Sequence, residues 1–435
     1  MVDVKDKSRF VGNFFLWPIT RTARTFRVFV VEPKEYLPRG HGRIFNAAIT
    51  SLLAPEPTPI DPFVKDSSVP GVEPFDLITF PEAFLPQDDL LNALQVISNL
   101  NSLGCVHVGL RPTDDNDQHL FSVQQIKMLI QSLLAIPQIS QSDLDAFSGW
   151  ITQQIGTKKF NIGCLFTIDA DRKLRVCLHP KVVRSKFEVS PLHEEHMAEA
   201  DLLTLVTLLP TDKTFKSVTL QPLICSDALH LDTDRPLSWP LEGVNDNADC
   251  FGDSLPDHVD IVSLATCTPQ PPWVSFGGIQ YRAWHQDFLD SFRRAASELH
   301  RHYSSTFVLS NFQTVLNGDP GGLSGVFIPV SLPSEKFPAF LTVSSWGKFK
   351  NSANKWSTPD DDTKKANGWS SLGYVACLDP AALNDTVPAC MLGFTIHRFP
   401  RDITRWKPVG GLVDFQLRRA TENSGDLAFR SWDDQ

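Results

Sequence analysis

The hydrophobic and polar positions of the chain fall into two repeating kinds of segment. Short, nearly continuous apolar runs rich in β-branched residues are typical of strands buried on both faces. Apolar residues at intervals of three and four are typical of helices with one buried face. Strands are predicted at residues 25–33, 75–80, 104–112, 160–168, 174–181, 218–225, 257–268, 305–311, 325–329 and 389–396, and helices at residues 44–53, 88–100, 123–134, 193–203 and 284–303. This interleaving of strands and helices indicates an α/β fold.

The less periodic stretches suggest how the chain is organised around these segments. One domain is predicted over residues 25–400, with an N-terminal arm at residues 1–24 and a C-terminal extension at residues 401–435. A chain of 435 residues, 42% of them hydrophobic, can bury a sizeable core without disulfides or metals. Three insertions into the domain are predicted, near residues 54–74, 113–157 and 345–369.

Charge and cysteine usage narrow the class of protein. The formal net charge of −10 argues against a partner that is a nucleic acid or an anionic membrane surface. None of the eight cysteines forms a C-x-x-C pair, so reduced thiols in a cytosolic protein are expected. The histidines and glutamates of residues 193–196 (His-Glu-Glu-His) lack the spacing of a zinc helix, and no metal is predicted. With no apolar run long enough to span a bilayer, a soluble cytoplasmic protein is expected.

Candidate chemistry lies at the ends of three apolar strands that are far apart in the sequence. These strands lead to Glu82, Lys181 and Cys225, and functional groups of α/β sheets collect at strand ends. A nucleophilic thiol needs a base, and a carboxylate in a dry environment can take its proton. The lysine ammonium and the backbone N–H of Ser226 would stabilise a tetrahedral oxyanion, and the ammonium would also favour thiolate over thiol.

Each of these three residues also has a purely structural interpretation. Cysteines in apolar runs are commonly inert packing residues, so Cys225 alone indicates little. Glu82 could be a solvated loop acid, although the neighbouring Phe80 favours partial burial, and Lys181 could be a surface charge. The catalytic interpretation therefore depends on all three residues occurring together.

Three short motifs resemble those of the nitrilase (carbon–nitrogen hydrolase) superfamily. Residues 80–82 (Phe-Pro-Glu) resemble its first motif, and residues 161–181, which run from an asparagine through an aspartate turn to a lysine, resemble its second. Residues 223–227 (Leu-Ile-Cys-Ser-Asp) are similar to the third motif. Downstream segments also correspond, and the resemblance covers roughly residues 25–400.

The resemblance implies both a fold and a reaction. The fold is an α-β-β-α sandwich of four layers. The reaction is hydrolysis of an amide, nitrile or ureido compound through a thioester, without a cofactor. On this basis Glu82 is expected to be the general base, Cys225 the nucleophile and Lys181 the stabiliser of the oxyanion.

The resemblance also implies features outside these three residues. A second glutamate between the lysine and the cysteine would align the site, and Glu194 and Glu195 are equally well placed. Trp273, which follows the strand at residues 257–268, is expected either to line the substrate pocket or to be a core tryptophan. A homodimer or a larger homo-oligomer is expected by resemblance alone. The alternative function is a non-catalytic or regulated sensor or assembly module of nitrilase-like fold that works with a partner protein, which the long insertions would suit.

Overall fold

The computed structural model describes most of the segments that the sequence pattern predicts. The described residues are 10–20, 25–36, 40–53, 75–113, 119–185, 197–229, 239–246, 256–268, 274–276, 279–281, 288, 291–292, 294–295, 298–302, 305–315, 321–322, 324–329, 341–343, 373–378, 387–398, 410–423 and 426–431. The predicted insertions near residues 54–74 and 345–369 lie outside them.

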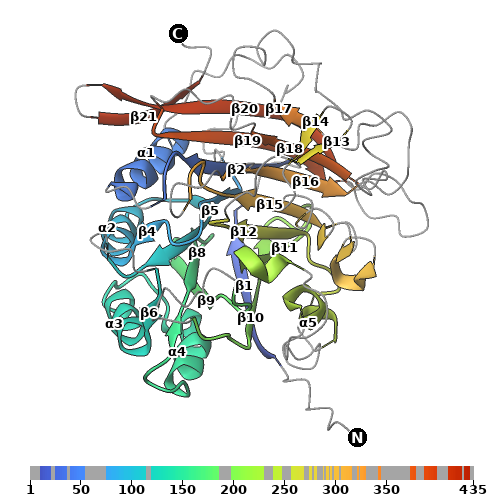
Figure 1. Cartoon of the computed structure of the whole chain (residues 1–435). Helices are drawn as coiled ribbons and strands as arrows, with labels where there is room; N and C mark the ends of the chain where they lie inside the picture. Colours follow the sequence, from blue (N-terminus) through green and yellow to red (C-terminus); the bar gives the residue numbers. More distant parts are fainter. Residues whose placement is uncertain are drawn as a thin grey trace, which may run out of the picture.

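Two large sheets form the centre of the molecule (Figure 1). The first sheet contains, in spatial order, β1 (Val11–Ile19), β10 (Leu202–Pro210), β11 (Val218–Ile224), β12 (Ile261–Ala265), β15 (Thr306–Ser310), β16 (Gly325–Pro329), β18 (Gly373–Leu378) and β17 (Leu341–Val343). The second contains β21 (Asp426–Ser431), β20 (Gly410–Asn423), β19 (Ala389–Arg398), β2 (Thr25–Pro33), β3 (Leu77–Thr79), β5 (Leu103–Arg111), β8 (Ile162–Ile168) and β9 (Leu174–Pro180), with β4 (Leu85–Pro86) paired to β5.

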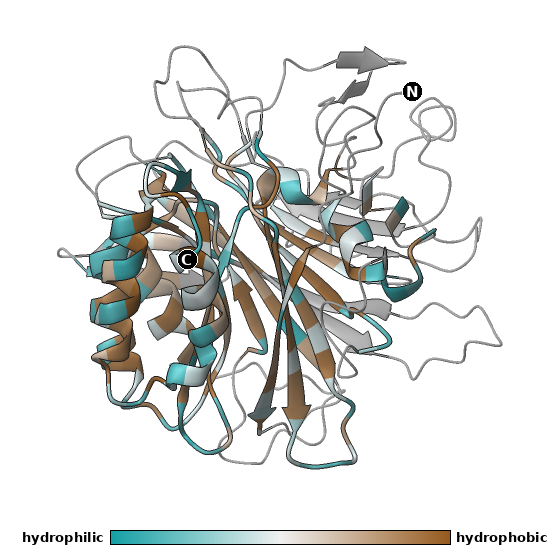
Figure 2. Ribbon diagram, turned by 90° about the horizontal axis from the view of Figure 1, so that it is seen from below, coloured by the Kyte–Doolittle hydropathy of each residue, from teal (hydrophilic) through white to brown (hydrophobic). Residues whose placement is uncertain are grey.

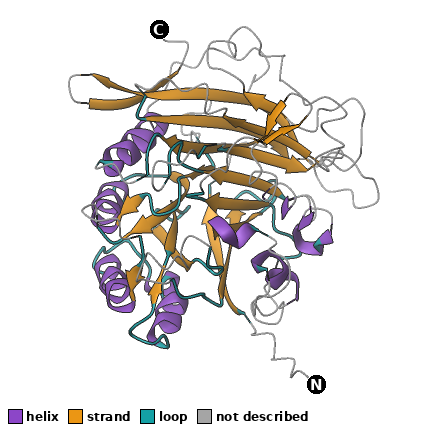
Figure 3. Cartoon of the chain, viewed as in Figure 1, coloured by secondary structure: helices purple, strands orange, loops and turns teal. Residues whose placement is uncertain are grey.

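Helices cover the outer faces of both sheets (Figure 3). The helices are α1 (His41–Leu53), α2 (Gln87–Ile97), α3 (Val123–Leu134), α4 (Asp145–Thr152) and α5 (Pro240–Asp246), with short 3-10 turns η1 (Gln141–Asp143), η3 (Cys225–Ala228) and η5 (His300–His302). Two small ribbons, β6 (Phe121–Ser122) with β7 (Lys159–Phe160) and β13 (Val274–Phe276) with β14 (Ile279–Tyr281), complete the described elements.

Three separate apolar clusters define the order of the layers. One cluster lies between α1–α4 and the nine-stranded sheet and includes Phe45, Leu133 and Phe166. The second fills the space between the two sheets, and the third joins the eight-stranded sheet to α5 and includes Leu241 and Phe307. In Figure 2 the central strands are mostly hydrophobic, whereas the flanking helices alternate in hydropathy. The predicted α-β-β-α four-layer sandwich is thus confirmed.

Local sequence signals explain several element boundaries. The helix predicted at residues 123–134 coincides with α3. It begins with a capping box, in which Ser122 Oγ accepts from the backbone N–H of Gln125 at 3.2 Å and the Gln125 side chain accepts from the backbone N–H of Ser122 at 2.8 Å. β5 and β8 are buried along their whole length, as their continuous apolar runs predict. α3 and α4 belong to the outer helical layer, although residues 113–157 were predicted to be an insertion.

The structure corrects three further sequence predictions. Part of the predicted N-terminal arm is β1, which pairs in parallel with β10 at the edge of the eight-stranded sheet. Part of the predicted C-terminal extension forms β20 and β21, which continue the nine-stranded sheet beyond β19. The predicted helix at residues 193–203 is not helical in its described part, because Leu202 already begins β10. In each case long-range strand pairing decides the structure, and local periodicity does not report it.

Among the described residues, no helix is long and apolar enough to cross a membrane.

Candidate active site

Cys225 lies on a sharp turn at the end of β11. Its φ angle is +48°, which is unusual for a residue with a side chain. Such a strained backbone conformation persists only where the surrounding structure holds it. The turn is closed by the backbone N–H of Ile224, which donates to Asp227 Oδ2 at 3.0 Å. The left-handed residue stops the strand and presents the thiol at its end. The side chain remains buried there, with 5% of its surface exposed.

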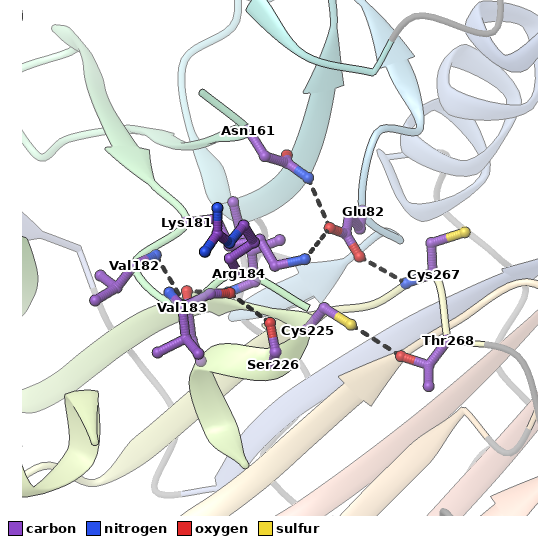
Figure 4. Close-up of polar contacts among 12 residues, drawn as sticks. Glu82, Asn161, Lys181, Val182, Val183, Arg184, Cys225, Ser226, Cys267 and Thr268 are labelled. Carbon is purple, nitrogen blue, oxygen red and sulfur yellow. Dashed lines mark hydrogen bonds and ion pairs between the residues drawn. The ribbon is translucent and has the colours of Figure 1, made fainter. Parts of the chain in front are cut away.

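Lys181 and Glu82 form a buried ion pair beside this turn (Figure 4). Lys181 Nζ lies 2.7 Å from Glu82 Oε1, and the side chains are 1% and 5% exposed. Glu82 Oε1 also accepts from Asn161 Nδ2 at 2.6 Å, and Glu82 Oε2 accepts from the backbone N–H of Cys267 at 3.0 Å. The carboxylate is therefore held from three directions, as an ionised group inside a protein requires.

A close approach between two backbone segments positions Glu82. The loop after β3 packs onto Gly109 of β5, where an added Cβ atom would lie 2.5 Å from Glu82 Cα and 2.5 Å from the nitrogen of Ala83. Ala83 itself has a φ angle of +49°. The backbone N–H of Gly109 donates to the carbonyl oxygen of Pro81 at 3.0 Å, which fixes the loop on the strand. Only a glycine leaves room for this contact, so Gly109 sets the position of Glu82.

Asp227 connects the cysteine turn to the segment that follows the lysine. Asp227 Oδ1 accepts from the backbone N–H groups of Val182 and Val183 at 2.9 and 2.7 Å. Ser226 strengthens the same connection, because its hydroxyl donates to the carbonyl oxygen of Val183 at 2.5 Å. Burial raises the pKa of Asp227 to about 7, while these backbone amides and the charge of Lys181 act in the opposite direction.

The segment that follows β12 contacts both the carboxylate and the thiol. The carbonyl oxygen of Thr266 accepts from the backbone N–H of Glu82 at 3.2 Å, and the next residue supplies the Cys267 N–H described above. Thr268 Oγ1 then lies 2.9 Å from Cys225 Sγ. Figure 4 shows that the thiol points toward this segment, beneath the carboxylate of Glu82.

The structure brings together the three residues that the sequence singled out. Glu82 follows β3, Lys181 follows β9 and Cys225 follows β11, so the nine-stranded sheet supplies the ion pair and the eight-stranded sheet supplies the thiol. Ser226 lies beside them, and its side chain serves the connection to Val183. The predictions for Glu194, Glu195 and Trp273 fall outside the described residues.

The sequence alone did not reveal the roles of three further residues. Asn161 and Asp227 stood within the quoted motifs, yet only the coordinates show that one bonds Glu82 and the other joins two loops. Thr268 gave no signal, because no local pattern relates a threonine to a cysteine so far away in the sequence.

Other buried thiols differ from Cys225 in their surroundings. Burial raises the pKa of Cys164 and the pKa of Cys177 well above the usual range of a thiol. Both lie within strands of the nine-stranded sheet and are packing residues. Within the part of the chain that the structure describes, no group of three or more His, Cys, Asp or Glu side chains is arranged to hold a metal ion.

Comparison with known proteins gives matches among solved structures only. No protein-family model matches the chain, and no curated protein matches it. A glutamine-dependent NAD+ synthetase from Acinetobacter baumannii is 12% identical with a TM-score of 0.36, and the match covers 69% of this chain and 41% of the synthetase. An N-terminal amidase is 10% identical with a TM-score of 0.34, over 70% of this chain and 90% of the amidase. The same amidase with a Gln-Gly peptide is 9% identical, with a TM-score of 0.36.

At these scores the function has to be argued from the residues of this chain. The chain spans 41% of the length of the synthetase, so the synthetase as a whole is not a guide to this protein. The four-layer sandwich and the meeting of Glu82, Lys181 and Cys225 are both features that the sequence motifs led us to expect.

Proposed function

We propose that the chain is a thiol-dependent hydrolase of a non-peptide carbon–nitrogen bond in an amide, nitrile or ureido compound. Cys225 is the nucleophile, Glu82 the general base and Lys181 the stabiliser of the oxyanion. The observation that carries the proposal is the Lys181–Glu82 ion pair, which is buried next to a thiol on a left-handed turn. No cofactor is needed for this chemistry.

The ion pair supports catalysis because it is a costly way to fill a protein interior. Taking a carboxylate and an ammonium out of water costs several kcal/mol per ion, and apolar residues of similar size are often at least as stable. A strained backbone at Cys225 adds a further cost at the same place. Costs concentrated in one small region are typical of functional sites.

The acylation step uses all three groups. Cys225 Sγ forms a bond to the carbonyl carbon of an amide substrate as its proton passes to the Glu82 carboxylate. The electron pair of the carbonyl bond moves onto oxygen, where the Lys181 ammonium and the backbone N–H of Ser226 stabilise the charge. When the oxyanion collapses, the carbon–nitrogen bond breaks and Glu82 gives its proton to the departing amine. The product is a thioester on Cys225.

Hydrolysis of the thioester repeats the sequence with water as the nucleophile. Glu82 takes a proton from water as the water oxygen bonds to the thioester carbon. Collapse of this second oxyanion breaks the carbon–sulfur bond, and Glu82 returns the proton to Cys225 Sγ. The carboxylic acid leaves, and the site returns to its starting state.

Turnover of a panel of small amides, nitriles and ureido compounds tests the proposal. The wild-type protein is expected to release product from at least one compound class, and Cys225→Ala is expected to abolish turnover while the melting temperature is kept. Cys164→Ala is the matched control, because it removes another buried thiol that lies away from the ion pair.

Labelling with iodoacetamide adds a measurement that needs no substrate. Cys225 is expected to react at neutral pH, and peptide mapping identifies the modified residue. A protein that turns over none of the panel and whose Cys225 is not alkylated would instead favour the non-catalytic module of nitrilase-like fold.

A further inference from the structure

We propose that Thr268 is a catalytic residue that hydrogen-bonds the sulfur of Cys225, with Asn311 as the positioning residue that holds Thr268 in place. This inference rests on the proposed role of Cys225 as nucleophile. Thr268 Oγ1 lies 2.9 Å from Cys225 Sγ, and both side chains are buried. In the neutral state either group can donate the hydrogen bond. Once the thiol loses its proton, only the threonine hydroxyl can donate.

The charge balance of the site makes this donor important. The ammonium of Lys181 lies 2.7 Å from the carboxylate of Glu82, so much of its positive charge is offset by that partner. A thiolate at Cys225 would add a second negative charge close to Glu82. A hydroxyl donor aimed at the sulfur lowers the cost of that charge, and bonds to ionised groups are stronger than neutral ones.

Asn311 holds the backbone of Thr268 on both sides. Asn311 Oδ1 accepts from the backbone N–H of Thr268 at 3.1 Å, and Asn311 Nδ2 donates to the carbonyl oxygen of Thr268 at 3.2 Å. The same Nδ2 donates to the carbonyl oxygen of Gly322 at 3.1 Å. Asn311 directly follows β15 and is fully buried. Because a carboxamide carries a donor and an acceptor, it can make this paired contact, which a carboxylate or an apolar side chain cannot.

The position of Thr268 also links the sulfur to the base. Thr266 and Cys267, directly before it, bind the backbone N–H and the carboxylate of Glu82. Three consecutive residues therefore contact the two groups between which the proton must pass. A segment anchored in this way fixes the spacing of Glu82 and Cys225, which proton transfer requires.

Alkylation of Cys225 by iodoacetamide as a function of pH tests the inference without a substrate. Thr268→Val replaces the hydroxyl by a methyl group of similar size, and it is expected to raise the pKa of the Cys225 thiol by about one unit. Alkylation at pH 7 should then fall about tenfold. Thr268→Ser keeps the hydroxyl and should retain the wild-type profile.

Two further variants separate this role from a merely structural one. Thr219→Val removes a different buried hydroxyl, from the strand that leads to Cys225, and its 2.9 Å bond to Thr207. It should change the melting temperature but leave the pKa of the thiol unchanged. Asn311→Ala should raise the pKa of the thiol in the wild-type background and add nothing in the Thr268→Val background, because it acts only through Thr268.

The outcomes separate this inference from the proposed function. If wild-type Cys225 is not alkylated at neutral pH, the proposed nucleophile is wrong and the inference fails with it. If wild type is alkylated and Thr268→Val has the same profile, the function stands and the role of Thr268 is refuted. Thr268→Ala serves as the second variant if the valine protein does not fold, and a wild-type profile there has the same meaning.

Discussion

The ion pair between Lys181 and Glu82 leads to a prediction that separates stability from catalysis. The two charged atoms are 2.7 Å apart, and both side chains are almost fully buried. At an effective dielectric constant of about 20, two unit charges at this distance attract by about 6 kcal/mol. Most of this attraction offsets the cost of removing both groups from water. The pair is therefore expected to contribute little net stability, although neither partner is tolerated alone.

Three variants test this expectation. Lys181→Met leaves a buried carboxylate that keeps the donors from Asn161 and Cys267, and Glu82→Gln removes the carboxylate that lies 2.7 Å from the buried ammonium. Each single variant should lose about 3–5 kcal/mol of unfolding free energy, because a buried charge has lost the oppositely charged group beside it. The double variant, with both charges gone, should lose less than either single variant.

Urea unfolding followed by tryptophan fluorescence measures the three free energies. Turnover, measured in parallel, should be absent in the double variant even where its stability approaches that of wild type. Losses that simply add in the double variant would refute the reasoning, since they would mean that the two charges do not compensate each other. Single variants as stable as wild type would show that the pair is solvated and not buried.

Three other predictions concern the surroundings of the site, and a fourth concerns the oligomeric state. Burial raises the pKa of Asp227 from 3.8 to about 7, so between these values the folded state keeps a proton that the unfolded state releases. This residue should therefore lower the free energy of unfolding by up to about 4 kcal/mol as pH rises from 4 to 7. The difference in unfolding free energy between wild type and Asp227→Asn, measured by urea unfolding across that range, should change by this amount, and a constant difference would contradict the prediction. Gly109→Ala should displace Glu82 and lower turnover at least tenfold, with a crystal structure showing the shifted loop, whereas Gly149→Ala, at an open helical position, should be neutral. We also propose that one of Glu194 and Glu195 aligns the site, so only one of the two Glu→Gln variants should lower kcat. We further propose that the protein is a homodimer or larger, so light scattering should give a multiple of 48.6 kDa.

Much of the fold could be predicted because its signals are local. Continuous apolar runs identified β5 and β8, which are covered on both faces, and helical periodicity identified α3. Three other apolar runs, which form β3, β9 and β11, located the candidate site because each led to a residue able to do chemistry. Sequence patterns of this kind report which side chains of a segment are buried and on which face they lie, and these are properties of a single segment.

The errors concern contacts that join distant segments. β1 contains a glycine, an asparagine and a proline, so its apolar pattern is broken, and it is stabilised as a strand by parallel pairing with β10. The contact of Thr268 with Cys225 likewise depends on two parallel strands, β11 and β12, ending side by side in register. Neither relation is written in a local window of sequence, because both are consequences of sheet topology.

The division of the site between the two sheets has a consequence for how it forms. The nine-stranded sheet positions Glu82 and Lys181, and the eight-stranded sheet positions Cys225 and Thr268. Backbone N–H groups join the two halves, because those of Val182 and Val183 donate to the Asp227 carboxylate and that of Cys267 donates to the Glu82 carboxylate. The charged pair and the thiol can therefore meet only when the apolar layer between the sheets is fully packed. The free-energy cost of the buried charges and of the strained residue would destabilise either sheet alone. Burial of the whole apolar layer between the sheets offsets this cost, so the site can hold these groups in its interior.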